Sequence, residues 1–173
     1  VLDDSGGNTA WNVVKWYNPD TPSDPWKTYR IGSTMNDLTY IDNTMGLWIY
    51  IINTGSDHTL HLNGVYSGSR EIELNTGWNM VGFPSLVSDT VGNSFWGTGV
   101  DRVAVYDPSE SKPIKEVDGS YIMRPGKAYW VHAPYDSIWV VDNTPLSEPY
   151  VVTGKVYLYD GTYSGGYNPL LST

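Results

Sequence analysis

The chain has 173 residues, a formal net charge of −9 and no cysteine. A surface of this sign repels phosphate backbones and anionic lipid headgroups, so we expect no nucleic-acid binding. The lack of cysteine excludes disulfide bonds, cysteine-ligated zinc and thiol catalysis. No apolar run is long enough to cross a bilayer, so we also expect no membrane insertion.

Eighteen Gly and 11 Pro interrupt every window before a helical period is established, which favours strands. We predict an all-β antiparallel fold, a sandwich or a barrel, with almost no helix beyond one turn at 34–38. A hairpin is expected between 70–74 and 78–81, with Gly77 in the left-handed position of its loop. Three pairs that tolerate positive φ predict type I′ turns: Asn63-Gly64, Asp118-Gly119 and Asp160-Gly161.

Three short patterns occur twice along the chain, in the same order. The paired segments are 11–14 and 78–81, 14–19 and 103–108, and 46–50 and 128–132. Such repetition predicts one folding unit of two pseudo-symmetric repeats, residues 9–63 and 76–143, that bury their aromatic rows against each other. The apolar run 47–52 predicts a central strand buried on both faces, and 129–131 takes the same place in the second half. Six rings of the repeated strands are assigned to the core: Trp11, Trp16, Trp48, Trp78, Tyr106 and Trp130.

Residues 1–145 are predicted to form one β domain. Residues 146–173 hold a linker and a fresh hairpin, which either completes the main sheet or begins a second β domain. A hairpin of this length is too short to be a domain by itself.

Three phrases carry a family resemblance: Gly-Trp-Asn-Met-Val-Gly-Phe-Pro at 77–84, Tyr-Asp-Pro at 106–108 and Pro-Gly-Lys-Ala-Tyr-Trp-Val at 125–131. They resemble repeat modules of secreted and cell-surface proteins of archaea and bacteria. The resemblance covers most of 9–143, although the first copy lacks the Gly-Phe-Pro element. Residues 152–157 are similar to the first strand of carboxypeptidase-regulatory-like sandwiches. The resemblance implies an extracellular, non-catalytic module and brings no catalytic residues with it.

No local signature supports catalysis or a transition metal. Ser109 and Lys112 have the Ser-x-x-Lys spacing, but the partner motifs of that nucleophile are missing. His58 and His61 would face opposite sides of a strand, so they cannot share a metal. Calcium is left open, because two loops carry hard oxygen ligands. These ligands are Asn18, Asp20 and Asp24 in one loop and Asp107 and Glu110 in the other.

A second group of rings lies among Pro, Gly and polar residues: Trp26, Tyr29, Phe95, Trp96, Tyr135 and Tyr167. If exposed, such rings stack on pyranose faces or anchor a protein interface; if folded back, they cap the core. The insertion 84–101 in the second half carries two of them, and loops that differ between matched halves are where function is often placed. All except Tyr167 are our candidate ligand-binding residues.

These observations predict a non-catalytic structural or adhesive β module of a secreted or cell-surface protein. We expect it to be monomeric in isolation, with a glycan or a cell-surface protein as its partner. The alternative is a carbohydrate-binding accessory module of an extracellular hydrolase. An enzyme would require a concave site with convergent carboxylates or a bound metal.

Overall fold

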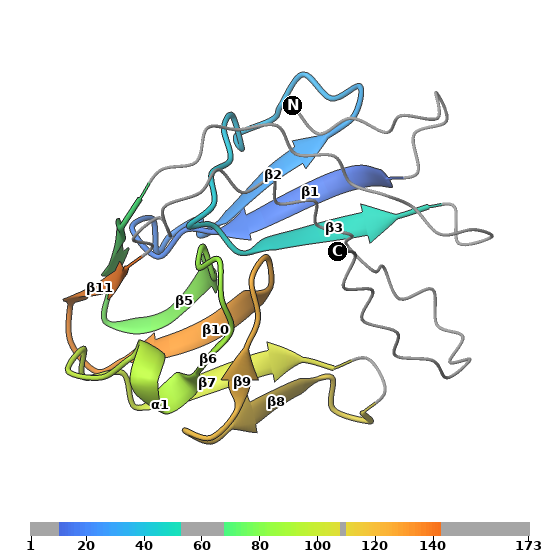
Figure 1. Cartoon of the computed structure of the whole chain (residues 1–173). Helices are drawn as coiled ribbons and strands as arrows, with labels where there is room; N and C mark the ends of the chain where they lie inside the picture. The colour runs from blue at the N-terminus through green and yellow to red at the C-terminus, as the bar shows by residue number, and fades with distance from the viewer. Residues whose placement is uncertain (1–10, 53–67, 108–109, 143–173) are drawn as a thin grey trace.

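The computed structural model describes residues 11–52, 68–107 and 110–142 (Figure 1). Within them the strands are β1 (Trp11–Tyr17), β2 (Trp26–Arg30), β3 (Leu47–Ile51), β4 (Arg70–Leu74), β5 (Gly77–Gly82), β6 (Asp89–Thr90), β7 (Arg102–Tyr106), β8 (Ile114–Val117), β9 (Ile122–Met123), β10 (Ala128–Ala133) and β11 (Ser137–Val141). One short helix, α1 (Val91–Ser94), accompanies them. All the strand pairs are antiparallel, which confirms the all-β prediction. Among these residues, no helix is long and apolar enough to span a membrane.

The described strands form open sheets and no closed barrel. The first sheet has three strands in the order β2-β1-β3, and the second sheet has four in the order β5-β10-β7-β8. Two further pairs, β11-β4 and β6-β9, lie beside the second sheet. In Figure 1 the first sheet lies above the second, and α1 sits below β5 and β10. The arrangement is that of an open, sandwich-like all-β fold.

Two glycines let the segment before β3 approach β5 closely and so join the two sheets. The Gly82 amide donates to the Thr44 carbonyl at 2.8 Å, and the Gly46 amide donates to the Met80 carbonyl at 3.2 Å. A Cβ atom at Gly82 would lie 2.7 Å from the Asn43 carbonyl oxygen, and one at Gly46 would lie 2.9 Å from Met80 Cγ. A side chain at either position would therefore force the two sheets apart.

The first and second sheets share three strands with the same order and register, β2-β1-β3 in one and β8-β7-β10 in the other. Corresponding cross-strand pairs are Val14–Ile49 and Val103–Val131, and Lys15–Trp48 and Ala104–Trp130. One backbone bond closes each hairpin, from Asn18 N to Pro25 O (2.7 Å) and from Asp107 N to Pro113 O (2.6 Å). This register matches two of the three repeated segments. That the complete halves are repeats stays a prediction, which the matched register supports.

The third repeated segment does not follow this correspondence. Residues 11–14 lie in β1, the counterpart of β7, whereas 78–81 lie in β5, which pairs with the other edge of β10.

The predicted hairpin between β4 and β5 is also wrong, because β4 pairs with β11. The Asn79 side chain closes the turn between them: its Oδ1 accepts from Asn75 N at 2.9 Å and its Nδ2 donates to Asn75 O at 2.8 Å. Gly77 does adopt the predicted positive φ, at 101°.

Other local predictions are confirmed or corrected by single elements. Ile72 and Leu74 are buried while the glutamates between and before them face solvent, as predicted. The helical turn lies at α1 instead of 34–38, because the Thr90 hydroxyl caps it by accepting from Asn93 N. Asp118-Gly119 is not a type I′ turn, since neither residue has positive φ. The other two Asx-Gly pairs lie outside the described residues.

Each half has its own hydrophobic core, which corrects the prediction of a common interior. The larger core lies between the second sheet and the elements β4, β11 and α1. At its centre Trp139 stacks on Phe83 at 6.0 Å, contacts Phe95 at 4.4 Å and donates from Nε1 to the Ser94 carbonyl. The smaller core beneath the first sheet consists of Trp11, Val14, Leu38 and Met45, with partly buried neighbours.

The halves meet instead through half-buried rings. Tyr17 lies edge-on to Trp130 at 5.3 Å, and Tyr106 lies edge-on to Trp48 at 4.7 Å. In the matched register Tyr17 corresponds to Tyr106 and Trp48 to Trp130, so the two contacts are reciprocal.

Of the six rings assigned to the core only Trp11 is buried, and Tyr106 is 50% exposed. β3 is accordingly no central strand of the described sheet, whereas β10 is central as predicted.

Candidate binding groove

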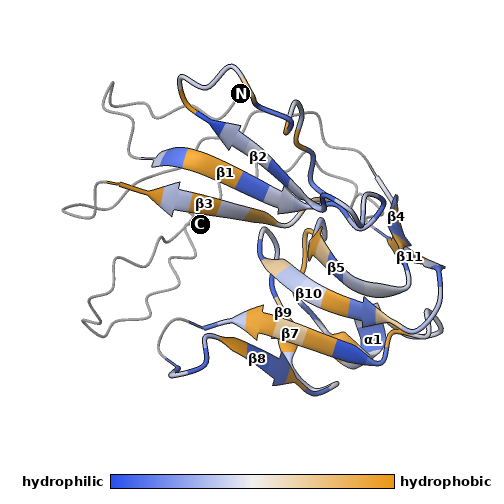
Figure 2. Cartoon of the chain, turned by 180° about the vertical axis from the view of Figure 1, so that it is seen from behind, coloured by the Kyte–Doolittle hydropathy of each residue, from blue (hydrophilic) through white to orange (hydrophobic). Residues whose placement is uncertain are grey.

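The outer face of the first sheet, opposite its core, carries the side chains that could serve a ligand. A register shift between Trp11 and Val13 marks a bulge at Asn12, which lets Trp11 and Val14 both face the core. Beyond the bulge, residues of β1 alternate between the two faces. In Figure 2 an apolar band and a hydrophilic band follow each other along this strand. Val13 and Lys15 therefore share the outer face with residues of β2 and β3.

Seven residues from the three strands line a groove of about 400 Å³ on this face, which we call the outer groove: Asn12, Val13, Lys15, Arg30, Trp48, Ile49 and Tyr50. Its volume falls within the range of roughly 300–1,000 Å³ that is usual for small-ligand sites. Val13 is buried at its base, and Tyr50 is 64% exposed beside it. Trp48 is half-buried, because Tyr106 covers one side of its ring.

The outer groove combines two flat rings, two cations and one amide. Lys15 and Arg30 are exposed, and within the described residues neither forms an ion pair. The Asn12 Oδ1 atom is buried and has no hydrogen-bond partner within the described residues. Among the residues that the structure describes, no carboxylate lines the groove. Such a surface can stack on a ring and pair with polar or anionic groups, but it offers no general acid.

On the corresponding face of the second sheet, basic and acidic side chains bond to one another. Arg102 bonds to Glu116 and lies 5.0 Å above the Trp78 ring. Nδ1 of His132 lies 2.7 Å from an Asp101 carboxylate oxygen. The hydrogen bond from His132 lowers the pKa of Asp101, and the hydrogen bond from Arg102 lowers the pKa of Glu116. These polar groups are thus already partnered.

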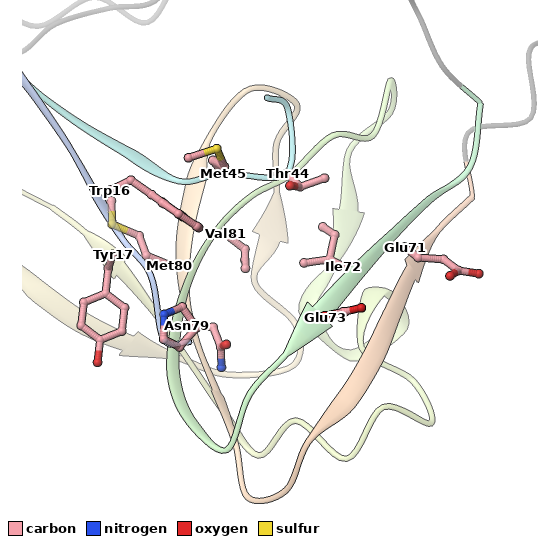
Figure 3. Close-up of a pocket in the computed structure, with 11 residues that line it drawn as sticks. Trp16, Tyr17, Thr44, Met45, Glu71, Ile72, Glu73, Asn79, Met80 and Val81 are labelled. Atoms are coloured by element: carbon pink, nitrogen blue, oxygen red, sulfur yellow. The ribbon is translucent and has the colours of Figure 1, made fainter. Parts of the chain in front are cut away.

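A second cavity, of about 120 Å³, lies at the junction of the two halves (Figure 3). Trp16, Met45 and Met80 give it an apolar wall. Glu71 and Glu73 lie at its other side, and in Figure 3 the Glu71 carboxylate points away from Trp16 and Met80. Both glutamates are exposed on β4. This cavity is a gap between packed elements, without groups converging on one point.

The structure separates the candidate ligand-binding residues. Trp26 and Tyr29 lie on β2, where Trp26 packs on Tyr17 and Trp130, and Tyr29 lies 6.1 Å from Trp11. These rings help to hold the halves together and to cover the smaller core. Both keep a little over a third of their surface exposed.

The remaining candidates lie at the end of the molecule formed by the insertion. Phe95 is only 6% exposed and belongs to the larger core, so its ring cannot receive a ligand. Trp96 is 88% exposed. Tyr135 is exposed too, and its hydroxyl lies so close to Gly99 that a Cβ there would be 1.9 Å away. Tyr167 lies outside the described residues.

The oxygen ligands considered for calcium are engaged by the fold. Asn18 Oδ1 accepts from the Asp20 amide at 3.0 Å, the Asp20 carboxylate accepts from Asn75, and Asp24 pairs with Lys27 at 3.4 Å. Across the part of the chain that the structure describes, no three His, Cys, Asp or Glu side chains converge on a metal position. Ser109, His58 and His61 lie outside that part.

The sequence prediction did not place Trp48 and Tyr50 in a groove, because the run 47–52 looks equally apolar on both faces. The signal that could have found them is on β1, where Lys15 follows the buried Val14 and lies opposite Trp48. A charged residue in one strand marks the outward face of its neighbour as well.

Comparison with protein-family models, with curated proteins and with solved structures found no match. The functional argument therefore depends on the residues and geometry of the outer groove.

Proposed function

We propose that the chain is a non-catalytic binding module of a secreted or cell-surface protein, and that the outer groove holds a saccharide. The observation that supports this most directly is the combination of Trp48 and Tyr50 with Lys15, Arg30 and Asn12 in one groove. Indole and phenol rings present flat apolar surfaces that match the C–H faces of a sugar ring, while amides and cations bond to its oxygens.

The strands that carry these side chains give the site a fixed shape. Lys15 and Trp48 are direct cross-strand partners, as are Val13 and Tyr50, and Val13 also pairs with Arg30. Paired strands hold the backbone in place, so no backbone has to be ordered when a ligand binds, which favours affinity from a small contact area.

A binding role is favoured over catalysis by the same inventory of side chains. Hydrolysis of a glycosidic bond normally needs two carboxyl groups on opposite sides of the bond. The described residues of the outer groove include none, and the exposed Glu71 and Glu73 lie on β4 at the junction cavity instead. We therefore propose an accessory or adhesive role, in which the groove brings the parent protein to a glycan.

Affinity electrophoresis over a panel of soluble polysaccharides tests this proposal. We expect at least one polysaccharide to retard the wild-type chain, and Tyr50→Ala and Trp48→Ala to weaken that retardation by roughly tenfold or more. Tyr50→Ala is the safer variant for folding, because its ring is 64% exposed. Trp96→Ala removes an even more exposed ring from outside the groove and is the matched control.

The outcomes are distinct. Loss of retardation in Trp96→Ala, with Tyr50→Ala unaffected, would place binding at the insertion and overturn the assignment of the groove. If no polysaccharide retards the wild-type chain, the saccharide proposal is wrong.

A further inference from the structure

We infer that the outer groove selects acidic saccharides, with Lys15 and Arg30 pairing with uronate carboxylates while Trp48 and Tyr50 hold the sugar rings. This inference depends on the proposed function and adds the class of ligand. It is carried by where the two cations lie beside the two rings, and by the absence of an ion pair at either cation within the described residues.

The cations and the rings form two rows across the first sheet. In one row Lys15 lies directly opposite Trp48, at the separation of about 5 Å that holds for cross-strand neighbours. In the other row Arg30 and Tyr50 flank Val13 on its two sides, about 10 Å apart. Each ring therefore has a cation in its own row. A sugar stacked on either ring would hold a carboxylate substituent within reach of that cation.

Three other cations, Lys27, Arg102 and Lys115, pair with nearby acids. Lys27 contacts Asp24 at 3.4 Å and Asp37 at 3.7 Å, and Lys115 contacts Glu110 at 3.0 Å. The chain has 19 acidic and ten basic residues, so an acidic partner is readily found. Lys15 and Arg30 form no ion pair within the described residues although both are exposed. Their charge remains available to a ligand.

The net charge of the chain makes this selectivity measurable. At −9 the molecule as a whole repels a polyanion, so attraction to an acidic polymer must come from a local site. Basic proteins bind acidic polymers non-specifically, which complicates such measurements. In this acidic chain, non-specific electrostatic repulsion weakens the binding of an acidic polymer.

The test compares pairs of polymers that have the same sugar backbone and carry charged or uncharged substituents. Polygalacturonic acid carries free carboxylates, and highly methyl-esterified pectin has the same backbone with those charges removed. Dextran sulfate and dextran form the second pair, which separates a carboxylate preference from a general preference for anions. The protein variants are the double substitution Lys15→Gln with Arg30→Gln, and Lys127→Gln as a control that removes an equal kind of charge from an exposed position outside the groove.

We expect polygalacturonic acid to bind more tightly than its ester. The double variant should weaken that binding roughly tenfold, because it removes two exposed ion pairs with the polymer. Its binding to the ester should change by no more than about twofold, and raising the salt concentration should reduce the difference between the two polymers. Lys127→Gln should bind as the wild type does.

Equal binding of the acid and its ester, with the double variant unaffected, would overturn acid selection while leaving the saccharide-binding function in place. Binding of dextran sulfate but not of polygalacturonic acid would overturn the assignment to uronates. Absence of binding to all four polymers and to the neutral panel would overturn the function itself. The two failures are therefore distinguishable.

Discussion

The outer faces of the two sheets are built from corresponding strands, but their side chains differ in chemistry. On the second sheet, Arg102 and Glu116 bond to each other and His132 bonds to Asp101. On the first sheet, the positions that correspond to Arg102 and His132 hold Val13 and Tyr50. One face satisfies its own charges, and the other has two cations, Lys15 and Arg30, that form no ion pair within the described residues. The same pairing of strands can thus give a stabilising surface in one half and a contact surface in the other.

The hydrophobic cores of the two halves also differ, in size. The larger core belongs to the second half and is built around the fully buried Trp139, whereas the smaller one contains four buried residues under the first sheet. We conclude that the second half supplies most of the stability. The first half can then carry exposed apolar and charged groups that contribute little to folding. The following substitutions test this division.

Trp139→Ala should have the largest effect. It removes a ring packed between Phe83 and Phe95 and an indole hydrogen bond, so we expect a loss of roughly 3–5 kcal/mol in the free energy of unfolding. Trp11→Ala in the smaller core should cost about 2 kcal/mol, because its indole nitrogen has no partner to lose within the described residues. Urea denaturation followed by circular dichroism measures both. Equal costs would contradict the proposed division of stability.

The two Trp-Asn segments give the next contrast. Asn79 is buried and bonds to the backbone of Asn75 in both directions, so Asn79→Ala should cost about 2–3 kcal/mol by leaving those groups unpaired. Asn12→Ala should stay within about 0.5 kcal/mol, because its Oδ1 has no partner among the described residues. The same denaturation assay applies. A large cost at Asn12 would show that its amide does support the fold.

The reciprocal ring contacts should contribute smaller and similar amounts. Double-mutant cycles to Ala on Tyr17 with Trp130, and on Tyr106 with Trp48, should each give a coupling energy of about 0.5–1.5 kcal/mol. The first is expected to be the larger, because Trp26 also packs on Trp130. A coupling near zero in one cycle and not in the other would mean that the contacts are reciprocal in position only.

The smallest effect is a pH dependence of stability to which the second face contributes. The pKa values of Asp101 and Glu116 are lowered by their hydrogen-bonded partners. A carboxyl group whose pKa is lower in the folded state stabilises the protein above its unfolded value, and this contribution is lost as the pH falls through the folded value. Stability should therefore decline below about pH 4, and less steeply in Glu116→Gln. Lys15→Gln should leave the profile unchanged, and thermal melting from pH 7 to pH 2 compares them.

Much of this fold follows from local patterns in the sequence. Alternation in β4 identifies which of its residues are buried. The repeated segments around Val14 and Val103 indicate that β1 and β7 occupy corresponding positions in their two sheets. The partner of β4 could not be predicted, because the Asn79 side chain turns β5 away from it and the true partner lies far along the chain. The outer groove was missed for a related reason: an apolar run does not reveal which of its faces another layer covers.

The free edge of β2 is blocked by the segment that follows it. The Thr28 amide donates to the Asp37 carboxylate at 2.6 Å, and the Arg30 amide donates to the Asn36 side chain at 2.8 Å, which in turn donates to the Arg30 carbonyl. A neighbouring polypeptide cannot extend the sheet from this side, since its hydrogen-bonding positions are already occupied. Copies of the chain at high local concentration therefore cannot pair their sheets through the β2 edge.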